Sequence, residues 1–296
     1  MPYLELLQHN PVLYLSLVFV LGLLVGSFLN VVIYRLPRIL KQQWRSECIS
    51  FLRQEGTQER IEEPANAKPF NLVIPRSSCP TCGHQITALE NIPVLSFLIL
   101  RGRCRQCQTP IPLRYPLVEL LSAILVTLVA WKFGVTVQAL AAIFLTWALI
   151  ALAFIDFDTR YLPDNITLPY LWAGLFLGLF GVFADLPSAV MGAIAGYVTL
   201  WTVFQVFKLI TGKEGMGYGD FKLLALLGAW LGWQALPGII LLSSVVGTLA
   251  GISLILFKKH ARSHPIPFGP YLAIAGWIAL LWGTDINSAY LNWIAA

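Results

Sequence analysis

The sequence has 296 residues, of which 57% are hydrophobic and only 12% are charged, and its mean hydropathy is +0.71. So little polar surface excludes an ordinary soluble domain of this length and indicates a protein embedded in a membrane. The net charge of +5 becomes informative only when the charged residues are placed along the chain.

The apolar segments predict an all-α bundle with about eight membrane-spanning helices, at about 20 residues each. In chain order we expect spans at 12–34, 115–132, 136–156, 165–184, 186–208, 221–234, 236–257 and 266–283. The first is long enough to cross a membrane and follows no basic segment, so we interpret it as a retained helix and not a cleaved signal peptide.

The Lys and Arg residues predict the orientation of this bundle. If the loops alternate between the two sides, only Lys132 of the 20 Lys and Arg residues lies on the side opposite the others. Short loops rich in these residues stay in the cytoplasm, so we expect both termini to face outward. The basic balance therefore indicates topology and attraction to membrane lipid, and no binding of nucleic acid.

One long polar segment, about residues 36–114, separates the first two spans. Its first part, residues 38–68, is charged and compatible with a helix, and its second part, residues 75–114, is rich in Cys, Pro, Gly and Arg. The apolar stretch 91–100 is too short to cross a membrane, so we expect a small core or an element at the membrane interface. The predicted parts are the first helix (1–36), a cytoplasmic insert (37–114) and the remaining bundle (115–296).

Four of the five cysteines form two CxxC pairs, Cys79 with Cys82 and Cys104 with Cys107, whereas Cys48 stands apart as a free thiol. Each pair can bring both sulfurs to one metal at about 2.3 Å, and the reducing cytoplasm disfavours disulfides. We therefore predict a structural Zn²⁺ site that supplies folding free energy to an insert too small to fold alone. A redox dithiol pair or an iron centre is the alternative.

Two acidic residues lie at the ends of predicted spans, where a carboxylate is costly and indicates function. Asp156 closes the third span, and Asp220 opens the sixth after a glycine-rich run, residues 215–219. Two carboxylates brought close on one membrane face cannot both ionise, so one holds a proton. The ionised partner can then take a proton from water while the other donates to the developing oxyanion, which is the apparatus of aspartic proteolysis.

Two further acids, Asp158 and Asp164, lie in the turn after Asp156. Their simpler interpretation is structural, because an acid there can cap the next helix or pair with Arg160, Lys213 or Lys222.

At this point the ordered motifs resemble the type IV prepilin peptidases, polytopic aspartic enzymes with a GxGD motif. The resemblance covers nearly the whole chain. The matching segments are 26–37, both CxxC pairs, 91–93, 101–104, 114–116, 119–120, 156–164, 217–222 and 267–270.

The resemblance implies that Asp156 and Asp220 are the catalytic pair. Asp156 is preferred to Asp158 because it lies seven residues before Pro163, as the first aspartate of the family does. It further implies that the substrates are type IV prepilins and type II secretion pseudopilins. Their short basic leader would be cut after a glycine at the cytoplasmic face of the bacterial inner membrane.

The cysteine-rich insert resembles that of family members that also methylate the new N-terminal amine, usually of phenylalanine, with S-adenosylmethionine. We expect the methyl donor near Gly102, Arg101 and Arg103. The acids Glu62 and Glu63 are expected to help hold the basic leader. The sequence leaves the identity of the pilin and the oligomeric state open.

Three rival interpretations remain. A presenilin-like protease would carry Tyr-Asp and Pro-Ala-Leu motifs, whereas this chain has Ile155-Asp156 and Pro267-Phe268-Gly269-Pro270. An ion or metal transporter would place its acids near the bilayer centre, between inverted repeats. An inactive subunit of a secretion machine has no need of two such carboxylates.

Overall fold

The computed structural model describes residues 2–54, 70–258 and 267–295, which are helices joined by loops. The helices are α1 (Pro2–His9), α2 (Pro11–Gln54), η1 (Leu89–Asn91), α3 (Leu95–Ile99), α4 (Arg114–Phe133), α5 (Val137–Thr159), α6 (Asp164–Gly178), α7 (Leu186–Thr211), α8 (Tyr218–Leu231), η2 (Trp233–Ala235), α9 (Leu236–Lys258) and α10 (Gly269–Ala295). They form two compact units. Met1–Leu15 and Leu128–Ala296 make up one, and Ser16–Thr127 makes up the other.

The prediction of an all-helical protein is confirmed in the described residues, and each predicted span coincides with a helix over most of its length. Within the part of the chain that the structure describes, five segments are long and apolar enough to cross a membrane: Pro11–Gln54, Arg114–Phe133, Val137–Thr159, Leu186–Thr211 and Trp233–Ser253. The helices α6 and α8 have 15 and 14 residues. They are therefore shorter than the roughly 20 residues that usually cross a bilayer.

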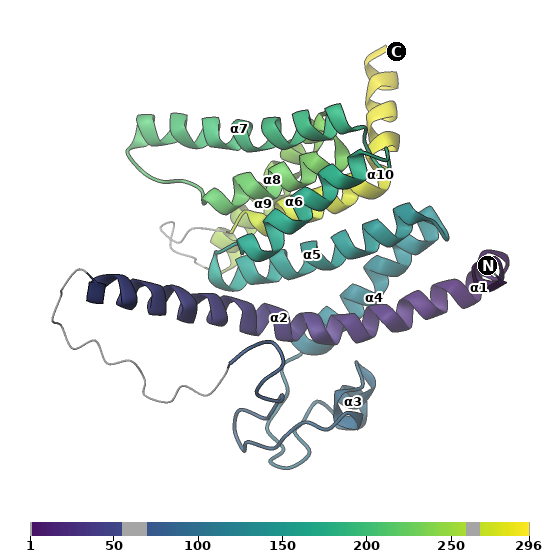
Figure 1. The fold of residues 1–296 in the computed structure, drawn as a ribbon, viewed down its shortest axis with the longest axis vertical. Helices are drawn as coiled ribbons and strands as arrows, with labels where there is room; N and C mark the ends of the chain where they lie inside the picture. The colour runs from purple at the N-terminus through teal and green to yellow at the C-terminus, as the bar shows by residue number, and fades with distance from the viewer. Residues whose placement is uncertain (1, 55–69, 259–266, 296) are drawn as a thin grey trace. The chain divides into compact units, whose positions relative to one another are not determined.

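Helix α2 continues where the sequence predicted a boundary. The first span was expected at 12–34, followed by a charged, helix-compatible segment at 38–68. The structure has one helix, α2, which runs unbroken for 44 residues through Pro37 to Gln54 (Figure 1). Proline removes one backbone donor inside a helix, and the flanking residues here continue the helix on both sides. Residues 55–68 of the expected helix, including Glu62 and Glu63, lie outside the described residues.

In the second unit, α2 packs closely against α4 through small residues one turn apart. A Cβ on Gly22 would lie 2.6 Å from Ala123 Cα, and one on Gly26 would lie 2.7 Å from Glu119 Cα. The hydroxyl of Ser122 donates to the Gly22 carbonyl at 2.7 Å. This is the close backbone approach that glycines four residues apart permit between membrane helices.

In the first unit, α8 is a short helix buried on almost every side. Its residues from Leu223 to Trp230 are all buried, as expected for a helix that is apolar all round. Gly192 on α7 meets Gly228 on α8 at a backbone contact that leaves no room for a side chain. On another side Trp230 donates to the Tyr170 carbonyl of α6 at 2.7 Å. Figure 1 shows α8 between α7 and α6, so the C-terminal end of α8 is held by its neighbours.

Candidate functional site

Asp156 lies in the last turn of α5, and its side chain is buried. The helix ends at Thr159 because Arg160 takes a left-handed conformation (φ 56°) and donates its N–H to the Asp156 carbonyl at 2.8 Å. The chain then passes through Pro163 into α6. Asp156 therefore lies at the end of a helix, as the sequence predicted.

The carboxylate of Asp156 is held by the first residue of α10. The backbone N–H of Gly269 donates to Asp156 Oδ2 at 3.0 Å. A Cβ at Gly269 would lie 2.7 Å from that same oxygen, closer than a carbon atom can approach. The residue must be glycine for this contact, and helix N-termini favour negative charge at such a place.

Asp220 is the third residue of α8, directly after the glycine-rich run. Its side chain is buried, and Oδ1 has no hydrogen-bond partner within the part of the chain that the structure describes. The preceding Gly219 lies against the loop after α5, where a Cβ would come within 2.8 Å of Leu162. This glycine therefore permits a close approach to Leu162, and it brings Asp220 toward the end of α5.

Both aspartates line one pocket of about 230 Å³. The other lining residues are Arg160, Tyr161, Leu162, Asp164, Gly217, Tyr218, Gly219 and Lys222. Two helix ends far apart in sequence thus bring two buried carboxylates to a single small pocket. This is the arrangement in which a pair of carboxylates can share one proton and activate a water molecule.

An ion pair spans the same pocket. Lys222 Nζ lies 2.7 Å and 2.8 Å from the two oxygens of Asp164, so it links the start of α8 to the start of α6. Pro163 occupies the cap position of α6, and Asp164 is the first helical residue. Of the two structural roles expected for Asp164, pairing with a cation is confirmed and capping is wrong. Asp158 is exposed at the end of α5 and does not line the pocket.

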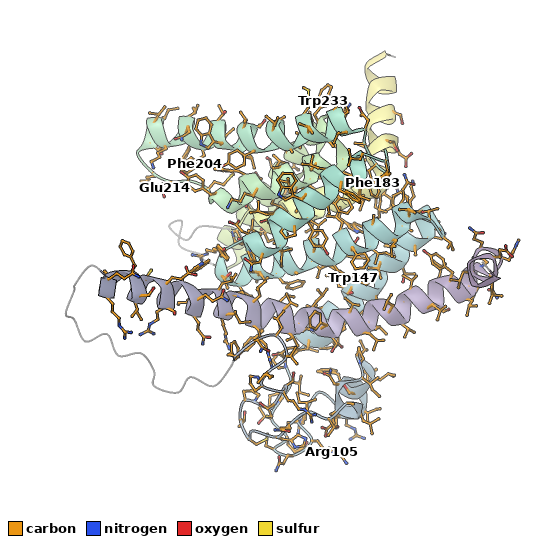
Figure 2. The ribbon with its side chains drawn as sticks, viewed as in Figure 1. Arg105, Trp147, Phe183, Phe204, Glu214 and Trp233 are labelled. Atoms are coloured by element: carbon orange, nitrogen blue, oxygen red, sulfur yellow. The ribbon has the colours of Figure 1, made fainter. Side chains whose placement is uncertain are left out.

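Aromatic residues fasten the glycine-rich run to α7. The ring of Phe204 on α7 lies 5.5 Å from that of Tyr218 and 5.6 Å from that of Phe221, centroid to centroid. Figure 2 labels Phe204 on α7 and Glu214 on the connection that follows, where Glu214 pairs with Lys208 at 2.8 Å. These contacts hold both ends of the loop that positions Asp220.

The four paired cysteines of the insert converge in the second unit. Their sulfur atoms all lie within 4.8 Å of one another. Cys79 and Cys107 are 3.7 Å apart, and Cys82 and Cys104 are 4.0 Å apart, sulfur to sulfur. Four sulfurs at about 2.3 Å from one tetrahedral metal would be about 3.8 Å from each other. The cluster therefore has the size of a metal site, whereas a disulfide needs about 2.05 Å.

The two CxxC segments have the same backbone hydrogen bonds, 25 residues apart. The N–H of Cys79 donates to His84 O at 2.9 Å, and that of Cys104 donates to Thr109 O at 2.9 Å. The residue after each second cysteine has a positive φ: 73° at Gly83 and 59° at Gln108. This repeated turn points both sulfurs of a pair in one direction. The sequence predicted the pairs but not the repeat, because the residues between the cysteines differ.

Hydrogen bonding and crowding change the acidity of these thiols. Backbone N–H groups of Cys82 and Thr81 lower the pKa of Cys79, and hydrogen bonds from Thr109 lower the pKa of Cys107 to about 6. Although the backbone at His84 acts in the opposite direction, burial and the neighbouring thiols raise the pKa of Cys82 to about 12. Four sulfurs so close together cannot all carry charge without a cation, so this donor set suits a thiophilic metal ion.

Beside the cysteine cluster, the carboxylate of Glu90 contacts one polar and two basic side chains. Glu90 accepts hydrogen bonds from Thr87 N at 2.9 Å and Thr87 Oγ1 at 3.0 Å, and its carboxylate lies 3.1 Å from His84 Nε2. The Thr87 and His84 contacts lower the pKa of Glu90 to about 2. Arg105, labelled in Figure 2, lies 3.6 Å from the same carboxylate.

Gly102, Arg101 and Arg103, where the sequence placed the methyl donor, form the turn that leads into the second CxxC segment. Gly102 has a φ of 67°, and a Cβ there would lie 2.8 Å from the ring of Phe97. Both arginines are exposed. The structure thus gives Gly102 a conformational reason to be glycine and leaves the arginine side chains accessible.

Comparisons with known proteins agree with this arrangement. Residues 20–133 match the family model described as the bacterial peptidase A24 N-terminal domain, and residues 143–252 match that of the type IV leader peptidase family. The chain belongs to the type IV leader peptidase family. The second match contains both pocket aspartates, and the first contains the four clustered cysteines.

Relatives of the same length support this membership. The chain is 60% identical to a protein of Aeromonas hydrophila over 98% of both chains. It is 55% identical to one of Stutzerimonas stutzeri over 97% of both chains, and 53% identical to one of Pseudomonas aeruginosa over 99% of this chain and 98% of that one. Each of these relatives is named prepilin leader peptidase/N-methyltransferase. No solved structure matches the chain significantly.

Sequence reasoning missed two features of the leader peptidase pocket. The contact of Gly269 with Asp156 was not foreseen, although the segment Pro267-Phe268-Gly269-Pro270 was recognised as a motif. A glycine at a helix start after a proline-rich turn was the available signal. The closeness of Leu162 and Gly219 had no sequence signal, because 57 residues (219 minus 162) separate them.

Proposed function

We propose that this chain removes the N-terminal leader from type IV prepilins and type II secretion pseudopilins by aspartic proteolysis, and then methylates the new N-terminus. The observation that carries the peptidase activity is the pair of buried carboxylates, Asp156 and Asp220, in one pocket. The names of the full-length relatives support both activities.

In the proposed mechanism, the two carboxylates hold one proton between them. The ionised carboxylate takes a proton from a water molecule as that water attacks the scissile carbonyl carbon, and the protonated carboxylic acid donates to the developing oxyanion or leaving amine. The N–H of Gly269 fixes one oxygen of Asp156. The Oδ1 of Asp220 has no hydrogen-bond partner among the described residues and leaves an acceptor for the water or the substrate.

The site's chemistry also fits the proposed substrate. A prepilin presents an apolar helical segment that lies in the membrane, with its leader at the membrane surface. The pocket lies between helix ends, and the exposed faces of the neighbouring helices are apolar, with Phe157 69% and Tyr218 52% exposed. A substrate helix can therefore lie against the bundle while its cleavage point reaches the carboxylates. Glu62 and Glu63 remain the proposed partners of a basic leader.

We further propose that the four cysteines bind a structural Zn²⁺ ion. The ligands would be the sulfurs of Cys79, Cys82, Cys104 and Cys107, whose spacing fits a tetrahedral ion. When bound, zinc would supply charge neutralisation and folding free energy to residues 70–113. A closed four-sulfur site leaves no open coordination position for a substrate.

The methyl donor in this proposal is S-adenosylmethionine, bound near Gly102, Arg101 and Arg103. The accessible guanidinium groups of the two arginines suit the carboxylate of such a molecule.

The parts of the chain would then be a first membrane helix (1–36), a methyltransferase-associated insert (37–114) and a peptidase bundle (115–296). Eight spans would place the active site at the cytoplasmic face of the inner membrane.

Processing in vesicles tests the proposed function. The purified chain is reconstituted with a prepilin, with and without S-adenosylmethionine, and the products are weighed by mass spectrometry. The Pseudomonas aeruginosa relative in matched vesicles is the positive control. We expect leader removal under both conditions and an added methyl group only with the donor. A prepilin that the relative cuts and this chain leaves intact would contradict the proposal.

A further inference from the structure

The short helix α3 of the insert exposes an apolar face. Leu95, Leu98 and Ile99 are 57%, 64% and 77% exposed. All three lie within the five residues of α3. Contiguous apolar side chains of this size are uncommon on water-facing surfaces and mark a contact with another apolar phase.

The position of α3 along α2 indicates which phase this is. The N–H of Val94, the residue before α3, donates to the Glu119 carboxylate at 2.8 Å. The Cα of Glu119 in turn lies against Gly26 of α2. Gly26 precedes Arg35 by nine residues (35 minus 26), or about 13 Å along a helix, and lies inside the apolar run. The start of α3 is therefore level with the membrane-embedded part of α2.

A constrained backbone at Val94 and a hydrogen bond to Glu119 attach α3 at this level. Val94 has a φ of 61°, which a β-branched residue adopts only when the surrounding structure imposes it. The constraint comes from Glu119, whose buried side chain is 8% exposed and accepts the Val94 N–H. This bond redirects the chain from the buried Pro93 into α3. The residue before α3 is therefore tied to α4 by a buried hydrogen bond.

The backbone around α3 meets the requirement for contact with lipid. In hydrocarbon, a backbone N–H must find its partner within the protein. Here the N–H groups of 95, 96, 98, 100, 101, 102 and 103 all donate to carbonyls of residues 92–100, at 2.6–3.1 Å. The segment thus turns back on itself without leaving these donors to water, and only its side chains face outward.

Basic residues follow directly. Arg101 and Arg103 are exposed at the end of this segment, just before Cys104 of the cysteine cluster. Long cationic side chains beside an apolar face extend to the headgroup level at the membrane surface. We propose that residues 92–100 enter the lipid leaflet that the insert faces, with Leu95, Leu98 and Ile99 against acyl chains, while Arg101 and Arg103 stay at the membrane surface.

The test places a fluorescent noncanonical amino acid at Leu98 in the full chain. A matched probe at Gln106 reports on an exposed position of the second CxxC segment. Both proteins are reconstituted in phosphatidylethanolamine vesicles with phosphatidylglycerol, and quenching by brominated acyl chains is compared with quenching by aqueous acrylamide. We expect brominated lipid to quench the Leu98 probe severalfold more than the Gln106 probe, and acrylamide to show the reverse order.

Two outcomes overturn the proposal. Equal quenching of both probes by acrylamide would place α3 in water. The proposal would also fail if α3 were accessible to acrylamide alone and became protected only when a prepilin is added. Protection of the Leu98 probe from both quenchers would show that protein covers α3. Zinc content verifies the fold of each labelled protein, and a probe at Ile99 replaces the one at Leu98 if zinc is lost.

Discussion

The backbone N–H of Gly269 donates to the carboxylate of Asp156 at 3.0 Å, and no side-chain carbon fits between them. The start of α10 is thereby in direct contact with the end of α5, 113 residues earlier in the chain. This contact gives the segment Pro267-Phe268-Gly269-Pro270 a physical role, which is to fix one of the two carboxylates.

Replacing Gly269 by alanine should reduce cleavage while leaving the fold intact. The new Cβ would lie 2.7 Å from Asp156 Oδ2, so the carboxylate must move. A displacement of about 1 Å costs an active site up to about 100-fold in rate. The matched control is Gly238→Ala in α9, where a Cβ meets nothing within 4 Å. Equal cleavage rates for the two variants would show that the Gly269 contact is not needed.

Breaking the ion pair between Lys222 and Asp164 should lower kcat about tenfold with little change in KM, because the pair ties together the two segments that border the pocket. The partly exposed pair should contribute no more than about 1 kcal/mol to stability. The measurement is cleavage kinetics of Lys222→Met beside Lys132→Met, which breaks a pair of similar length, 2.9 Å, at Asp285.

The exchanged pair, Asp164→Lys with Lys222→Asp, is the complementary variant. It should recover part of the lost rate if the link itself matters. A Lys222→Met enzyme as fast as the Lys132→Met enzyme would refute the positioning role.

Removing one sulfur of the cluster should release the metal. Cys104→Ser should lower bound zinc from about one ion per chain to none, because a three-sulfur remnant with a buried hydroxyl binds far more weakly. Residues 70–113 should then become sensitive to protease. Cys48→Ser is the control, since Cys48 is exposed and lies outside the cluster. Bound zinc is measured by elemental mass spectrometry. Zinc retained by the Cys104 variant would contradict the assignment of the four cysteines as its ligands.

Substituting Gly102 tests the methyl-donor proposal. In Gly102→Ala the residue would be strained at a φ of 67° and would press on Phe97, which shifts Arg101 and Arg103. We expect the methylated fraction of product to fall about tenfold, equivalent to about 1.4 kcal/mol in the barrier, with leader cleavage unchanged. Gly134→Ala has a similar φ of 62° and an open surrounding, so it controls for backbone strain. Normal methylation by the Gly102 variant would place the donor elsewhere.

The sequence predicted the positions of the helices because apolar runs and their polar ends follow directly from composition. It also predicted that Asp156 and Asp220 stand at helix ends, since each adjoins an apolar run. The first span was expected at 12–34, whereas α2 continues through Pro37 to Gln54, because one missing hydrogen bond does not end a helix whose neighbours continue it. The contacts of Gly269 and Gly219 were not predictable, because they depend on how distant helices pack.

The most direct test of the central claim is leader cleavage by Asp156→Asn and Asp220→Asn. Asparagine keeps the shape of the side chain and cannot ionise. Asp158→Asn is the matched control, since Asp158 is exposed and outside the pocket. The account predicts that both pocket variants stay folded and zinc-bound but lose cleavage, while the control cuts at the wild-type rate. Wild-type cleavage by either pocket variant would contradict the assignment of the two aspartates as the catalytic pair.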